Sequence, residues 1–154
     1  NDLRSWTNPP PHLLAAEVEG HAEFAVAQAL ASPLLDLAHV VVHPLGGDTW
    51  QVDVGVQNVG WLPTYVSERA KSDRLTRPVE VEVSGDGVEV LDGPTMRELG
   101  QLDGSMSARF DRGRGGSPER AMTRFTIRAA AGSDLVIDAR HERAGRRSRV
   151  VTLS

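Results

Sequence analysis

Strict alternation of apolar and polar residues is the feature that most constrains how this chain can fold. From Trp50 to Val56 every second residue is large and apolar, and the residues between them are polar or glycine. The same period of two recurs in residues 79–83, 124–128 and 135–140. A strand with this period has one apolar and one hydrated face, which is typical of antiparallel sheets. The pattern therefore predicts a mainly β protein.

Turn-forming residues separate these segments at short intervals. Residues 46–48, 84–87 and 132–134 each combine glycine with aspartate, and glycine adopts positive φ without steric strain. Short strands at this spacing favour an immunoglobulin-like antiparallel β-sandwich of seven or eight strands. The expected strands are residues 35–44, 49–58, 78–84, 87–91, 95–103, 121–129, 134–141 and 146–153.

One N-terminal α-helix is expected over residues 11–31. Its apolar residues recur at spacings of three and four, a run of prolines precedes it, and Pro33 disfavours its continuation. We therefore expect two parts: an N-terminal extension and helix in residues 1–32, and a β-sandwich in residues 33–154. The first ten residues hold little apolar material, which suggests a fragment of a longer protein.

Two stretches do not alternate. Residues 66–76 are polar and predict a crossing between sheets with one helical turn. Residues 104–120 are rich in Gly, Ser, Asp and Arg and predict a mobile loop.

Composition excludes several partners and sites. The 17 basic and 21 acidic residues give a net charge of −4, so we expect no nucleic-acid partner. No apolar run approaches the roughly 20 residues that span a bilayer, so we expect no membrane insertion. The absence of cysteine excludes disulfides and thiolate zinc sites but leaves the compartment undetermined.

The histidines do not predict a metal site. His39 and His43 enclose three valines, which favour a strand, and four strand residues would place the two rings roughly 13 Å apart. A shared zinc ion needs bonds near 2 Å. No histidine begins an H-x-x-E motif, and no G-x-S-x-G motif or phosphate-binding loop is present. We therefore expect no catalytic residue, metal ligand or cofactor in this chain.

Arginines near the C-terminus form the first candidate binding surface. Arg143, Arg146 and Arg147 lie on an expected hairpin, and guanidinium groups suit bidentate recognition of carboxylate or phosphate. The alternative is a solvated hairpin whose arginines pair with acids on the strand faces.

Two aromatic residues form the second candidate. Trp61 and Tyr65 flank Pro63 in a loop and could be exposed as a platform for a sugar ring. The alternative is that they anchor the loop to the core, as we expect for Trp50 on its strand.

The segment VDVGVQNVGWLPT, residues 52–64, carries the most specific resemblance. It is similar to a strand and turn of bacterial immunoglobulin-like domains of the cell-adhesion-related type, in which Asn-x-Gly ends a central strand and the glycine takes positive φ. The structural motif consists of Asn58, Gly60, Leu62, Pro63 and Thr64.

A more complete resemblance is to the C-terminal region of bacterial carboxypeptidase A-like zinc peptidases. In that family the final peptidase helix is followed by a proline, a P-L-G hairpin and an N-x-G-x-L-P-T segment. The corresponding residues here are Asn8-Pro9-Pro10, Glu17, His21, Phe24, Pro33, Leu35, Pro44-Leu45-Gly46 and Asn58 to Thr64, with later matches around Glu98 and His141.

The resemblance implies a role as well as a fold. It implies that the helix is the last helix of a peptidase domain and that the sandwich is a non-catalytic C-terminal domain that supports or positions that peptidase. Zinc and its ligands are then expected only upstream, and the peptidase domain is the expected partner through the helix. The alternative is a module that binds glycan, cell-wall polymer or peptide, and an autonomous enzyme is a third.

Overall fold

The computed structural model describes residues 10–106 and 118–154, and it divides the chain into two compact units, residues 1–31 and 32–154. Most of the loop expected over residues 104–120 lies outside the described residues, as do Asn8 and Pro9 of the resemblance.

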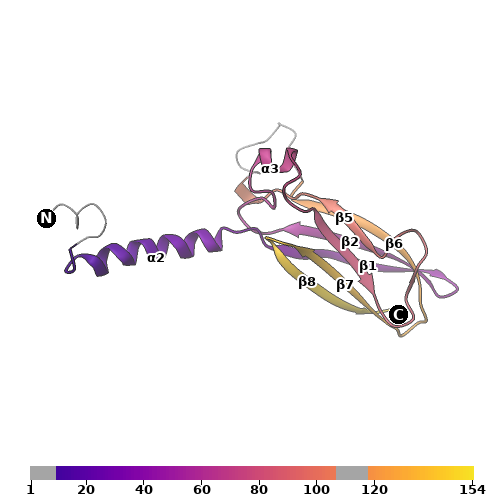
Figure 1. Ribbon diagram of the computed structural model, residues 1–154. Coiled ribbons are helices and arrows are strands. Elements are labelled where there is room, and N and C mark those ends of the chain that lie inside the picture. Colours follow the sequence, from indigo (N-terminus) through magenta and orange to yellow (C-terminus); the bar gives the residue numbers. More distant parts are fainter. Residues whose placement is uncertain (1–9, 107–117) are drawn as a thin grey trace. The chain divides into compact units, whose positions relative to one another are not determined.

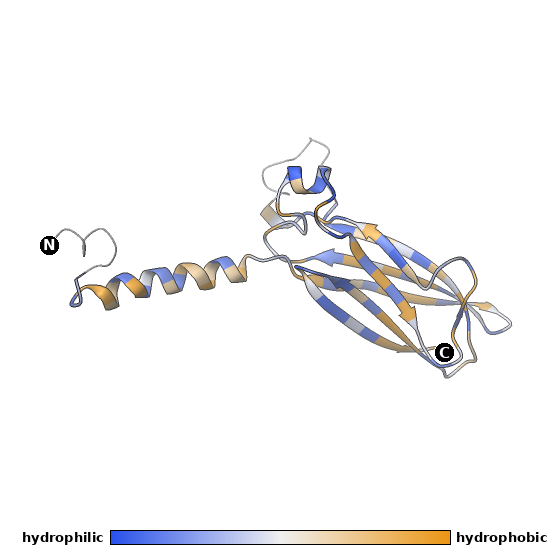
Figure 2. Ribbon diagram, viewed as in Figure 1, coloured by the Kyte–Doolittle hydropathy of each residue, from blue (hydrophilic) through white to orange (hydrophobic). Residues whose placement is uncertain are grey.

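The first unit contains helix α2, Leu14–Leu30, within the expected range. None of its residues is buried, and its large apolar side chains are among the exposed ones. Orange and blue segments alternate along this helix in Figure 2. Within the described residues, no helix has the length and apolar character needed to cross a membrane.

The second unit is an antiparallel β-sandwich of two four-stranded sheets (Figure 1). One sheet has the order β1-β2-β6-β4 and the other β5-β3-β7-β8. The strands are β1 Leu35–Gly46, β2 Thr49–Asn58, β3 Val79–Ser84, β4 Glu89–Val90, β5 Met96–Gly100, β6 Arg120–Arg128, β7 Asp134–His141 and β8 Gly145–Thr152. The predicted antiparallel β-sandwich of seven or eight strands is confirmed, with eight strands in the part of the chain that the structure describes.

One difference from the expected strands has a local cause. Strand β5 ends at Gly100 instead of residue 103, because Gly100 has a φ of +80° and turns the chain out of the sheet. Beyond this turn Leu102 is buried and pairs with Thr64, which precedes the crossing segment of residues 66–76. The expected helical turn in that segment is α3, Glu68–Ser72, which Ser67 caps by accepting a hydrogen bond from the amide of Ala70.

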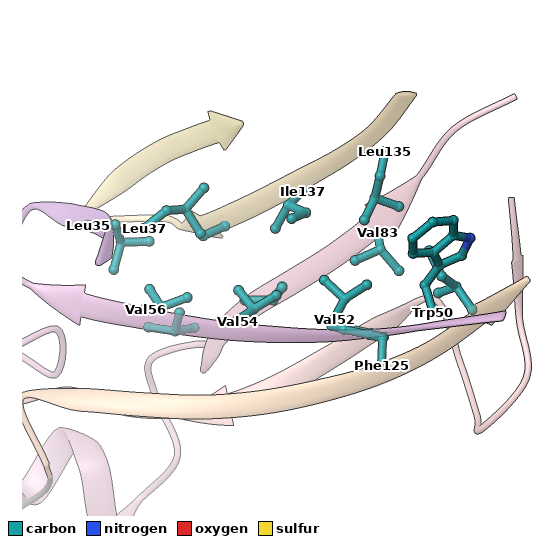
Figure 3. Close-up of a cluster of buried hydrophobic side chains, with 14 of the residues drawn as sticks. Leu35, Leu37, Trp50, Val52, Val54, Val56, Val83, Phe125, Leu135 and Ile137 are labelled. Atoms are coloured by element: carbon teal, nitrogen blue, oxygen red, sulfur yellow. The ribbon is translucent and has the colours of Figure 1, made fainter. Parts of the chain in front are cut away.

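The core lies between the two sheets and uses the apolar faces that alternation predicted. Trp50, Val52, Val54 and Val56 of β2 face Leu135 and Ile137 of β7 in Figure 3. Trp50 is buried as expected, and its indole Nε1 donates to the carbonyl of Ala129 at 2.9 Å. Burial of the ring therefore leaves no polar atom unpaired.

Two arginines of the second sheet reach across the seams of the sandwich. Arg97 of β5 lies 4.2 Å from the centre of the Phe125 ring and donates to the carbonyl of Arg124 and to Oδ1 of Asp92. On the opposite edge, Arg149 of β8 donates to the carbonyl of Leu37 at 3.0 Å. Each arginine therefore connects an edge strand of one sheet to the backbone of the other.

Candidate functional site

Asn58, the first residue of the resemblance motif, is a fully satisfied buried hub. Asn58 is only 1% exposed. Oδ1 accepts from the amides of Leu34 and Gly60, both at 3.0 Å. Nδ2 donates to the carbonyls of Leu62 at 2.9 Å and Asp103 at 3.1 Å. One amide group thus joins the start of the sandwich, the turn after β2 and the segment after β5.

Gly60 is required for a different reason from the one the sequence suggested. Gly60 is not one of the described glycines that have a positive φ, so the expectation of positive φ at this residue is wrong. A Cβ at this position would lie 2.3 Å from the carbonyl oxygen of Ser32 and 2.7 Å from the amide nitrogen of Leu34. Glycine is needed because two backbone segments approach too closely for any side chain.

The end of the motif continues this anchor. Thr64 is fully buried; its amide donates to the carbonyl of Leu102, and its hydroxyl accepts from the amide of Leu102 at 2.9 Å. The same hydroxyl lies 2.6 Å from Oε1 of Gln101. Leu62 and Pro63 are half-buried beside it. The motif is therefore structural, and it fixes where the chain enters the sandwich.

The proposed aromatic platform is not formed. Tyr65 is only 6% exposed, so the alternative that it anchors the loop to the core holds for this residue. Its hydroxyl donates to Oδ1 of Asp103 at 2.6 Å, and burial, together with this carboxylate, raises the pKa of Tyr65. Lys71 lies 4.6 Å from the centre of the ring. Trp61 is 39% exposed.

The three hairpin arginines do not act as one cluster. Arg146 forms a two-contact ion pair with Asp138, with its Nε 2.6 Å from Oδ1, and this guanidinium lowers the pKa of the Asp138 carboxyl. Pairing with a strand-face acid, the alternative reading, therefore holds for Arg146. Arg143 and Arg147 are exposed and form no ion pair in the described part of the chain.

His141 organises the turn of this hairpin. Its Nδ1 accepts from the amides of Arg143 at 3.1 Å and Ala144 at 3.2 Å, so the ring proton is on Nε2, which donates to the carbonyl of Arg77 at 3.0 Å. Burial lowers the pKa of His141. The neutral ring is the form that fits these contacts.

Two hollows share the lining residues Arg77 and Pro78, and His141 lines the first of them. The first, of about 360 Å³, is bounded by the ion-paired Arg140 and Arg146. The second, of about 440 Å³, lies between the crossing segment and the end of β5. Its lining residues are Lys71, Arg74, Leu75, Thr76, Arg77, Pro78, Glu98 and Gln101.

Sequence reasoning missed the cations of the second hollow. Arg74 lies in the polar stretch of residues 66–76, which predicts only a crossing, and Arg77 follows that stretch. Nothing in the spacing of the two arginines indicates that Glu98 and Gln101 fold against them. Long-range packing alone brings these four together.

A third hollow, of about 280 Å³, lies on the outer face of the first sheet beside His39 and Asp53. His39 and His43 both lie in strand β1, as their valine-rich spacing predicts. Among residues 10–106 and 118–154, no group of three or more His, Asp or Glu side chains is placed to hold a metal ion.

Comparison with known proteins places the sandwich in a family. No curated protein matches the chain. The family model that matches is described as a domain of unknown function, DUF8731, and it covers residues 34–152. The match begins after helix α2 and ends in the last strand, so it follows the boundaries of the sandwich. Through its β-sandwich the chain belongs to the DUF8731 family.

Proposed function

We propose that the sandwich is a non-catalytic accessory domain of a bacterial zinc carboxypeptidase-like metallopeptidase, and that helix α2 belongs to the peptidase side of the junction. The observation that carries the proposal is the state of α2. None of its residues is buried, although Leu14, Val18 and Phe24 are large and apolar. Apolar helix surface of this kind is normally covered, and the upstream peptidase domain is the partner that covers it in this proposal.

The junction supports the same division. The family match starts at residue 34, and Leu34 is held by Asn58 at the point where the sandwich begins. Gly60 packs directly against the backbone of Ser32 and Pro33. An anchored entry point suits a domain that must keep its attachment to a neighbour fixed while it supports or positions that neighbour.

Zinc is assigned to the peptidase domain in this proposal. The described part of this chain offers no cluster of three His, Asp or Glu side chains that fits the ion. The chain's own contribution is therefore the anchored sandwich and the helix. Hydrolysis of a terminal peptide bond would take place on residues upstream of the helix.

The test compares this chain with the same chain extended upstream in its natural protein. We expect the extended protein to bind one zinc ion and to release C-terminal residues from peptides, and the chain alone to do neither. The double substitution Val18→Ser and Phe24→Ser in the extended protein should lower its peptidase activity. It should leave the fold of the sandwich unchanged. The proposal would be refuted if the chain alone showed zinc-dependent hydrolysis. It would also be refuted if the protein extended upstream showed none.

A binding role for the sandwich is the second candidate. The loss of Tyr65 from the surface argues against a two-ring sugar platform, and the ion pair of Arg146 removes the central residue of the arginine surface. The hollow beside Arg74 and Arg77 is the observation that favours binding, through residues other than those expected.

A further inference from the structure

We infer that the hollow beside Arg74 and Arg77 binds the terminal carboxylate of a peptide whose last side chain is apolar. The hollow has a volume of about 440 Å³, within the range of sites that hold small ligands. This inference does not depend on the peptidase assignment.

The charge of the hollow favours an anion. Lys71, Arg74 and Arg77 line it, and Glu98 is the one acidic residue among its described lining residues. Lys71 is already committed, because its Nζ lies 3.5 Å from Oε1 of Glu68 and over the Tyr65 ring. Arg74 and Arg77 form no ion pair within the described residues. Among the described residues, two guanidinium groups are thus not engaged in ion pairs, in a chain whose net charge is −4.

The backbone that carries Arg77 is held from three sides. Its amide donates to Oε1 of Glu142 at 3.1 Å, and its carbonyl accepts from Nε2 of His141 at 3.0 Å and from Nε2 of Gln101 at 2.8 Å. On the Arg77 side these contacts use only backbone atoms, so they do not engage its guanidinium. A fixed backbone reduces the entropy lost when the side chain binds a ligand.

Arg74 occupies a position where glycine would be the less strained residue. It follows α3 with a φ of 53°, and the amide of Leu75 closes onto the carbonyl of Ala70 at 2.9 Å, as at a helix end. A left-handed φ is unfavourable for arginine and free for glycine. Backbone conformation therefore does not require arginine here, and a ligand contact would account for it.

The apolar part of the lining favours a peptide end over a bare inorganic anion. Leu75, 73% exposed, and Pro78 line the same hollow as the two arginines. An anion with no apolar body would leave these two side chains in water. A terminal residue offers a carboxylate to the arginines and an aliphatic side chain to Leu75 and Pro78.

The experiment titrates the chain with an N-acetylated tripeptide that ends in leucine, and with the same tripeptide as its C-terminal amide. Binding is followed by NMR amide shifts and by calorimetry. We expect the free acid to bind with a Kd on the order of 1 mM and to shift amides in residues 71–78 and 98–101. The amide should bind at least about tenfold more weakly, because it lacks the charge that the arginines recognise.

Variants separate this site from diffuse attraction. Arg74→Gly should leave the unfolding midpoint no lower and weaken binding about fivefold, and adding Arg77→Gln should bring the loss beyond about tenfold. Glu98→Gln should tighten binding about threefold, because it removes the like charge. Arg147→Gln makes the same charge change outside the hollow and should alter the Kd less than about twofold.

Several outcomes would overturn the inference. One is that the free acid shifts no amide resonance in residues 71–78, and another is that the C-terminal amide binds as tightly as the free acid. A third is that Arg147→Gln weakens binding as much as the substitutions in the hollow do. Tighter binding of inorganic phosphate than of the peptide at the same arginines would show that the ligand class is wrong. If the double variant does not fold, Glu98→Gln and the shift map of the unaltered chain decide the question, since neither removes an arginine.

Discussion

Single side chains decide whether the segments at the entry of the sandwich stay together. Asn58 is the strongest case because its four hydrogen bonds use both the acceptor and the donor capacity of one amide. Asn58→Asp keeps the shape and the acceptor but places a second oxygen against the carbonyls of Leu62 and Asp103. We expect a loss of about 3 kcal/mol in unfolding free energy, measured by urea denaturation.

Gln57→Glu is the matched control for this change. It alters the neighbouring residue in the same way, but Gln57 lies on the outer face, where its Oε1 accepts from Nη2 of Arg120 at 2.8 Å. We expect a change within about 0.5 kcal/mol. Equal losses in the two variants would show that added negative charge, and not the buried hub, is responsible.

His141 gives the sandwich a pH dependence of defined sign. Burial lowers its pKa from 6.5, so the unfolded chain takes up a proton at a higher pH than the folded chain does. The contribution of this residue to stability is complete above pH 6.5 and declines as the pH falls below 6.5 toward the folded-state pKa.

The measurement is the urea midpoint at several pH values between 7 and 5.5. His141→Gln should be less stable at pH 7 and should show a smaller decline on acidification than the unaltered chain. His43→Gln, which changes an exposed ring on β1, should keep the decline. An unaltered slope in His141→Gln would exclude this histidine as its cause.

At the scale of elements, alternation predicted most strands because each pairs one apolar face with one wet face. What alternation cannot show is where separate segments touch. Gly60 and Tyr65 illustrate this: the close approach of Ser32 and the carboxylate of Asp103 come from segments 28 and 38 residues away in the sequence. The hollow at Arg74 escaped prediction for the same reason. The local sequence pattern predicts which face of a strand is buried, whereas tertiary packing determines which residues come together in a site.

Arg97 is the element-scale contact with the clearest energetic consequence, because it covers the Phe125 ring and joins β5 to β6. Its side chain is only 22% exposed. Arg97→Ala removes the ring contact, the carbonyl bond and the Asp92 pair, and we expect a loss of about 2 kcal/mol. Arg128→Ala, which breaks an ion pair with Glu89 whose side chains are 58% and 63% exposed, should cost less than about 0.5 kcal/mol. Both losses in unfolding free energy are measured by urea denaturation. Similar values for the two variants would contradict the stabilising role of the Arg97 contacts between β5 and β6.

At the scale of the whole molecule, the sandwich should be a complete folding unit. Its buried apolar residues run from Leu35 to Leu153, and all eight strands lie within residues 32–154. Removing residues 1–31 should therefore leave the urea midpoint unchanged and the m value within about 15%, because m follows the surface exposed on unfolding. Circular dichroism should show only the loss of helix. Removing residues 145–154 is the control: it deletes β8 and the buried Leu153, so the cooperative transition should weaken or vanish. A lower midpoint after removal of the helix would mean that α2 stabilises the sandwich and would weaken its assignment to a neighbouring peptidase domain.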